Sequence, residues 1–366
     1  MKRIKNIISV IVFAVFLVAV SAVCLAKPAT RYSDAERREL AQFPKTTAES
    51  VASGEFSKGF ESYTTDQFPM RDIMRRIKAA FSTAILGKAE NNGLFYVDGH
   101  ISKIDDAKSE AMMNHAAERF TYIRDKYLKD NEIYFSIVPD KNMFLAEKNG
   151  YPSLDYVCFI QEMKSKVDFM EYVDVTDLLS ADYYYKTDTH WRQESITDVA
   201  ERLMSAMGKE VGGVTYKENV LDIPFRGVYS GQYALNVPAD TIKYLTNDTI
   251  NNAIVTYYDT GVPRTGEMYN MDKASGKDPY EMFLSGTMPL VTLENPNGTT
   301  GNYLILFRDS FGSSIAPLFL EGYDKVTVID TRYVQSDFLG NLVDFGGADV
   351  LFLYSTSLLN NSLAIR

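Results

Sequence analysis

The 366-residue chain is poor in cysteine and histidine and has no excess of positive charge. Its two cysteines are Cys24, in an N-terminal apolar run, and Cys158. Without that run a single cysteine remains, so an internal disulfide is excluded and Cys158 is expected to be a small buried apolar side chain. Three histidines and scattered acids supply no metal ligand set, so neither a metal nor another cofactor is expected. The net charge of −10 excludes nucleic acid as a partner, because no basic cluster is present to neutralise phosphates.

The N-terminus predicts export across a membrane. Lys2, Arg3 and Lys5 precede Ile7–Ala26, twenty residues without a charge, which is long enough to cross a bilayer as a helix. The basic flank would stay in the cytoplasm and the remainder would be exported. Cys24 and Ala26 form an acceptable small-residue cleavage site, but the run is longer than a usual signal core. Residues 1–29 are therefore a signal peptide or a membrane anchor, and a lipoprotein signal is disfavoured because Val23 before Cys24 is too large.

The rest of the chain divides by pattern. Residues 30–60 are polar and predict a linker or stalk, and residues 61–366 predict the main domain. Residues 60–86 have apolar positions at helical spacing, interrupted at Phe68-Pro69, and this helix is expected to dock on the body of the protein. Residues 93–104 predict a hairpin turning at Asp98-Gly99, with His100 at the surface.

The main domain has an α/β pattern. Apolar strands at 133–138, 172–175, 304–307, 326–330 and 350–354 alternate with helices such as 108–128, 194–207, 315–321 and 335–345. This alternation predicts a parallel sheet flanked by helices, whose ligands bind at the carboxyl ends of the strands. Residues 212–302 break the pattern and predict an insertion rich in strands and loops that rims the site. Its tyrosines either stack on sugar rings or pack a small core of their own.

The stretch 183–192, YYYKTDTHWR, holds the first candidate site residues. Asp188 and His190 are two positions apart, and in an extended segment such residues point to the same side. A carboxylate beside an imidazole holds one tautomer and leaves the far ring nitrogen as a base. Alternatively, Asp188 or Thr189 simply caps the following helix.

The stretch 304–314, LILFRDSFGSS, holds a further candidate site residue, Ser310. Its apolar strand turns at Arg308-Asp309-Ser310 into a predicted helix, which would place the Ser310 hydroxyl at a strand end beside free backbone N–H groups. Ser310 or Asp309 could equally be an N-cap. Ser310, His190 and Asp188 together predict an acyl-transfer triad, with Ser310 N–H as the one oxyanion donor that the sequence suggests.

These stretches carry a family resemblance. YYKTDTHW at 184–191 resembles the signature of the bacterial DHHW proteins, relatives of the alginate O-acetyltransferases (AlgX and AlgJ) in the SGNH hydrolase superfamily. DQFPMRD at 66–72, VPDK at 138–141 and RDSFG at 308–312 fit the same family, and the likeness covers most of the chain. One signature position, usually histidine, is Thr189.

The resemblance implies a circularly permuted, flavodoxin-like SGNH fold and transfer or removal of an O-acyl group, acetyl first of all, on a cell-surface or exported polysaccharide. It implies an extracytoplasmic location and a membrane-bound acyl donor protein as partner. Trp191, Arg332 and Tyr333 are expected to contact the substrate, although Arg332 could instead form an ordinary ion pair. The alternative function is a non-catalytic glycan-binding or envelope-assembly protein on the same fold.

Overall fold

The structure, a computed structural model, describes residues 2–259 and 262–366. The chain forms two compact units. The first consists of Met1–Asn92 with Val228–Val237, and the second of Gly93–Gly227 with Pro238–Arg366. The units thus divide at residue 93 and not at the expected domain start, residue 61, because residues 30–60 fold together with the helices that follow them.

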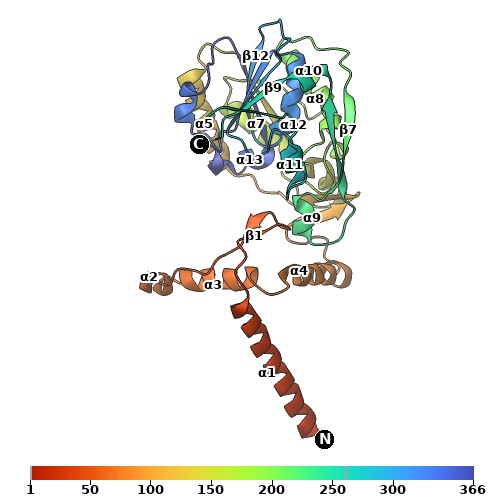
Figure 1. Cartoon of the computed structure of the whole chain (residues 1–366). Helices are drawn as coiled ribbons and strands as arrows, with labels where there is room; N and C mark the ends of the chain where they lie inside the picture. The colour runs from red at the N-terminus through yellow and green to blue at the C-terminus, as the bar shows by residue number, and fades with distance from the viewer. Residues whose placement is uncertain (1, 260–261) are drawn as a thin grey trace. The chain divides into compact units, whose positions relative to one another are not determined.

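The first unit is mostly helical (Figure 1). Its elements are α1 (Lys2–Ala26), β1 (Tyr32–Ser33), β2 (Arg38–Glu39), α2 (Ala48–Ala52), α3 (Glu55–Asp66), α4 (Arg71–Ala80), a π-helical turn (Phe81–Ile85) and α9 (Val228–Tyr233). The expected break lies between α3 and α4, where Pro69 follows Phe68 and Met70 adopts a positive φ.

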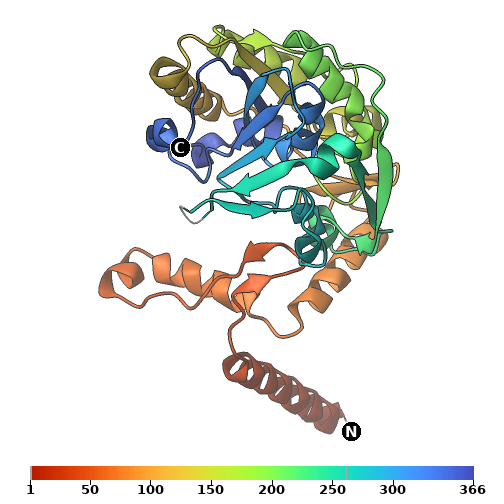
Figure 2. The same ribbon diagram turned by 45° about the horizontal axis from the view of Figure 1, so that its top comes forward.

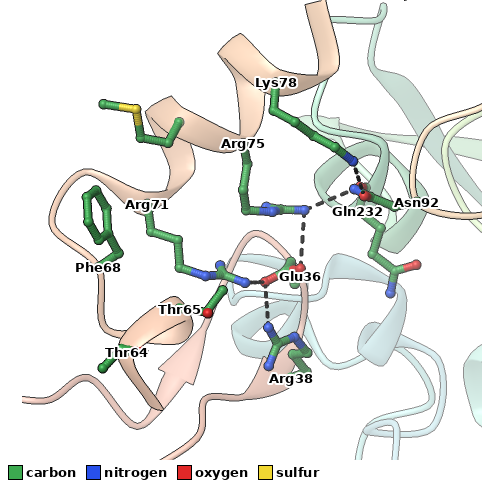
Figure 3. A pocket seen from close by; sticks show the side chains of 11 residues that line it. Glu36, Arg38, Thr64, Thr65, Phe68, Arg71, Arg75, Lys78, Asn92 and Gln232 are labelled. Atoms are coloured by element: carbon green, nitrogen blue, oxygen red, sulfur yellow. Dashed lines mark hydrogen bonds and ion pairs between the residues drawn. The ribbon is translucent and has the colours of Figure 1, made fainter. Parts of the chain in front are cut away.

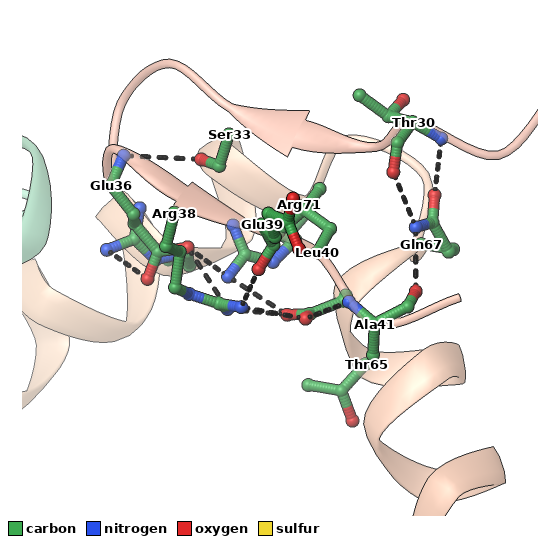
Figure 4. A network of polar contacts seen from close by, with 12 residues as sticks. Thr30, Ser33, Glu36, Arg38, Glu39, Leu40, Ala41, Thr65, Gln67 and Arg71 are labelled. Atoms are coloured by element: carbon green, nitrogen blue, oxygen red, sulfur yellow. Dashed lines mark hydrogen bonds and ion pairs between the residues drawn. The ribbon is translucent and has the colours of Figure 1, made fainter. Parts of the chain in front are cut away.

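A polar network joins the β1–β2 hairpin to α3 (Figure 4). Arg38 donates to both carboxylate oxygens of Asp66, at 2.8 and 2.6 Å, and the N–H of Ala41 donates to the same group. The Gln67 side chain holds Thr30 by two hydrogen bonds of 2.8 Å. The Arg38 hydrogen bond lowers the pKa of Asp66 to about 2, so this carboxylate is charged at neutral pH. Residues 30–60 are therefore fixed to α3 and do not form a bare linker.

The second unit is built on one eight-stranded sheet with the order β10-β9-β11-β13-β12-β14-β5-β6. The strands β5 (Ile133–Val138), β6 (Glu171–Tyr172), β12 (Tyr303–Arg308), β13 (Lys325–Ile329) and β14 (Asp349–Ser355) pair in parallel. The α/β fold with a mostly parallel sheet is confirmed.

Alternation along the central strands gives the sheet two apolar faces. On β12, Leu304 and Leu306 belong to one core, whereas Ile305 and Phe307 belong to the other. The helices α8 (Thr197–Ala206) and α12 (Gly312–Ile315) contribute to the first core, and α5 (Glu110–Tyr127) and α7 (Tyr156–Lys166) to the second. Both faces are thus covered, as a parallel sheet requires.

The segment 212–302 differs from the expected insertion. Its first strands, β7 (Lys217–Phe225) and β8 (Asp240–Thr246), pair only with each other. Its later strands, β9 (Ile254–Tyr257), β10 (Arg264–Gly266) and β11 (Leu290–Glu294), add to the main sheet in antiparallel register, with teal β9 and β10 at one edge in Figure 2. The sheet is mixed, and this segment is part of its framework.

The predicted hairpin is present as β3 (Leu94–Val97) and β4 (His100–Lys103), with Asp98 and Gly99 both at positive φ. His100, however, is buried at 2 % exposure and was wrongly expected at the surface. Burial disfavours its charged form and lowers its pKa to about 4. Cys158 was expected to be buried, but its side chain is partly exposed beside Lys108 and Glu162.

We predict that His100 makes the protein acid-sensitive. Its pKa in the folded chain lies below the ordinary value of 6.5, so between these values the unfolded chain binds a proton that the folded chain does not. The free energy of unfolding should therefore fall as pH drops from 6.5 toward 4. The variant His100→Phe should lose less stability over this range than the wild type in urea unfolding followed by circular dichroism. Equal pH slopes for the two proteins would contradict the prediction.

Candidate active site

The turn after β12 presents Ser310 at the carboxyl edge of the sheet. The neighbouring Asp309 is buried, and one of its carboxylate oxygens accepts the N–H of Phe311 at 3.0 Å. The other accepts the N–H and the hydroxyl of Ser355, at the end of adjacent β14, at 2.8 and 2.6 Å. Asp309 thus fixes the turn, and Phe311 is the N-cap of α12 without a side-chain bond, so the Ser310 hydroxyl has no capping task.

Asp188 and His190 lie in a loop between two facing residues, Tyr184 and Trp191, which form an antiparallel bridge. The N–H of Tyr185 donates to the carbonyl of His190 at 3.0 Å. The loop is bent and not extended as expected. The side chains still meet, because the N–H of His190 donates to Asp188 Oδ1 at 3.1 Å and brings the carboxylate back to the ring.

The structure brings all three predicted residues together. His190 Nδ1 lies 2.6 Å from Asp188 Oδ1, and His190 Nε2 lies 2.8 Å from Ser310 Oγ. A carboxylate only accepts, so Nδ1 carries the proton and Nε2 is the acceptor for the serine hydroxyl. Asp188 is fully buried, His190 is 9 % exposed and Ser310 is partly exposed. This geometry permits proton transfer from a serine that substrate can reach.

Lys141 fixes the loop that carries Asp188 and His190 by hydrogen bonds to its backbone. Its Nζ donates to the carbonyls of Tyr185, Lys186 and Asp188 at 2.8, 3.1 and 2.8 Å, and its side chain is buried. Burial lowers the pKa of Lys141 to about 7. The VPDK element therefore supports the backbone of the candidate site.

The segment 212–302 also forms hydrogen bonds with this loop. Asp240 accepts the N–H groups of Lys186 and Thr187 at 2.8 and 2.7 Å. The N–H of Gly227 donates to the Thr187 hydroxyl at 2.9 Å. The backbone at Gly227 passes so close that an added Cβ would lie 2.3 Å from the Asp188 Cβ. Only glycine fits there without moving the carboxylate.

Tyr280 is a site residue that the sequence did not reveal. Its ring stacks on the imidazole of His190, with centroids 3.9 Å apart and planes at 9°. Its hydroxyl lies 3.0 Å from Ser314 Oγ, and burial raises its pKa. The stack fixes the plane of the imidazole. The only signal in the sequence was the abundance of tyrosine in this segment.

The three residues expected to contact the substrate, Trp191, Arg332 and Tyr333, lie in three different environments. Trp191 is fully buried, and its Nε1 donates to the Phe311 carbonyl and to Ser314 Oγ, both at 3.0 Å, so it positions the site and cannot contact a polymer. Arg332 forms a two-bond ion pair with buried Asp330, at 2.8 and 2.7 Å. Tyr333 is 48 % exposed beside the Arg332 guanidinium.

Comparison with solved structures finds the same architecture in bacterial proteins. A DHHW family protein from Eubacterium siraeum is 22 % identical, with 75 % of this chain and 95 % of that chain covered at a TM-score of 0.61. Bacillus cereus PatB1, solved with a sulfonyl adduct, is 16 % identical, with 73 % and 97 % covered at a TM-score of 0.54. The chain shares the fold of both proteins. No protein family and no curated protein matches its sequence. The resemblance to the DHHW proteins is thus confirmed at the level of the fold.

We predict that Gly227→Ala disrupts the candidate site of this DHHW-like fold. The new methyl group would push Asp188 from His190, and misplacement of about 1 Å can cost on the order of 10²-fold in rate. The rate of Ser310 modification by a sulfonyl fluoride, followed by mass spectrometry, should fall by roughly that factor. Gly212→Ala is the matched control, because an added Cβ there has no atom within 4 Å. Equal rates in the two variants would contradict the prediction.

Proposed function

We propose that the protein transfers or removes an O-acyl group, acetyl first of all, on a cell-surface or exported polysaccharide. The observation that carries the proposal is the chain of two short hydrogen bonds from Asp188 through His190 to Ser310. Side-chain groups at these distances form the arrangement that activates a serine for acyl transfer on several unrelated folds.

In the proposed reaction, Ser310 Oγ attacks the ester carbonyl of the acyl donor and its proton passes to His190 Nε2. The tetrahedral intermediate collapses, and the leaving alcohol takes that proton, which leaves the acyl group on Ser310 as an ester. Water or a glycan hydroxyl then attacks this ester and gives its proton to His190, which returns it to Ser310. Asp188 stabilises the imidazolium in both steps, and the Ser310 N–H is the proposed oxyanion donor.

The proposed location is outside the cytoplasm. The helix α1 is apolar over Arg3–Cys24, which is long enough to cross a membrane. Retention beside the membrane would suit a polysaccharide that is modified during export, with acyl groups supplied by a membrane-bound donor protein. Cleavage after Ala26 would instead release the protein. Tyr333 is the proposed glycan contact, because its ring is exposed.

We predict that Ser310→Ala, His190→Ala and Asp188→Asn each reduce hydrolysis of p-nitrophenyl acetate by roughly 10³-fold or more, since triad members act as a unit. Ser165→Ala, a change at an exposed position of helix α7, should leave the rate unchanged. A sulfonyl fluoride should sulfonylate Ser310 in the wild type, with loss of HF, and not in His190→Ala.

Two results would contradict this proposal. One is wild-type turnover no faster than that of Ser310→Ala, and the other is modification of a different residue. Glycan binding that persists in Ser310→Ala without any turnover in the wild type would favour the non-catalytic alternative on the same fold.

A further inference from the structure

The helix α4 and the π-helical turn after it expose an apolar stripe. Its side chains are between 43 % and 69 % exposed and comprise Met70, Ile73, Met74, Ile77, Phe81, Ile85 and Leu86. Most of them follow a spacing of three or four residues and so lie on one side of the helix. We call them the α4 stripe. Patches of this kind mark interaction surfaces.

The polar side of α4 faces the rest of the first unit instead. Arg71 pairs with Glu36 and Asp66, and Arg75 donates to the carbonyls of Gly231 and Gln232 at 3.0 and 3.2 Å. These arginines and Lys78 line a cavity of about 900 Å³ (Figure 3). Ala79 and Ser82, on the same side, are buried. The usual arrangement of a surface helix is thus inverted, because Arg71, Arg75 and Lys78 are paired inward and the apolar side chains point out.

A second apolar surface lies in the same unit. Phe43, Phe56, Phe60 and Tyr63 form an aromatic cluster around α3, with ring centroids 5.4 to 6.4 Å apart. Phe43 and Phe60 are nevertheless 57 % and 42 % exposed. The first unit therefore exposes apolar surface on α3 as well as on α4.

Chain length places these surfaces near the end of α1. The helix α1 ends at Ala26, and Thr30 is held by the Gln67 side chain at the end of α3. Four residue steps span at most about 14 Å, so Gln67 is tethered within roughly that distance plus its own side chain of the end of α1. The helix α4 begins four residues later, at Arg71. The nearest large apolar phase is thus the membrane that α1 would enter.

The charges beside the α4 stripe fit an anionic lipid surface. Arg76 and Lys88 are exposed, whereas Asp72 is the exposed acid on α4. Apolar side chains flanked by cations are the features of helices that lie in the plane of a membrane interface.

We propose that the α4 stripe inserts into the interfacial region of the membrane that α1 crosses, so that the first unit lies on the lipid surface. The proposal rests on the membrane tether that forms part of the proposed function. The α4 stripe would contact lipid, and neither a partner protein nor a second copy of the chain is required.

Tryptophan fluorescence can test this in the full chain, because its single tryptophan, Trp191, is buried. The variant Ile77→Trp is reconstituted, one copy per nanodisc, in phosphatidylcholine and phosphatidylglycerol with or without brominated acyl chains. Emission from position 77 should shift to the blue and be quenched by the brominated lipid. Phe81→Trp should behave in the same way. Asp72→Trp, on another side of the same helix, is the matched control and should be quenched less, while the wild type reports the Trp191 background.

Other outcomes overturn the proposal in distinguishable ways. Unquenched emission from positions 77 and 81, in discs where protease protection shows α1 inserted, would reject the lipid contact and leave the tether intact. Quenching or a blue shift that appears only with two copies per disc would assign the α4 stripe to self-association. If the chain does not remain in the discs, the tether itself fails, and this inference fails with it.

Discussion

The hydrogen bond between His190 and Ser310 joins two segments that are 120 residues apart in the chain, and the chemistry proposed for this protein depends on it. Neither partner is placed by its own local structure alone. Ser310 follows a strand whose turn is fixed by Asp309 and the end of the adjacent strand. His190 lies in a bent loop without regular structure. The site therefore needs a rigid sheet edge on one side and a well-supported loop on the other.

Support for the loop comes from three directions. Lys141 satisfies three of its carbonyls, Asp240 accepts two of its N–H groups, and Tyr280 covers the imidazole face. Two of these residues belong to the segment 212–302, which also adds three strands to the sheet. That segment therefore borders the site and also supports it structurally. A buried amine, a carboxylate and a stacked ring together restrict the imidazole far more than any one of them would.

The first unit meets a different constraint. Arg38 and Arg71 pair with Asp66 and Glu36 within the unit, while apolar side chains remain on the outer side of α4. In water such exposure is unfavourable, because no apolar surface is removed from solvent. Beside a lipid surface the same arrangement becomes favourable. Both α4 and the membrane tether would remove apolar side chains from water into lipid, and both would keep the protein close to the membrane.

The sequence alone was sufficient for the parts of this protein that depend on local pattern. Apolar runs predicted the central strands, Phe68-Pro69 predicted the break between α3 and α4, and the stretches 183–192 and 304–314 marked Asp188, His190 and Ser310 as candidate site residues. Only the tertiary structure decided the burial of His100 and Trp191, the inward pairing of Arg332, the direction of the strands from 212–302, and the roles of Lys141, Gly227 and Tyr280. Periodicity and turn chemistry are properties of neighbouring residues, whereas burial, close approach and stacking arise between residues that are distant in the chain and meet only after it folds.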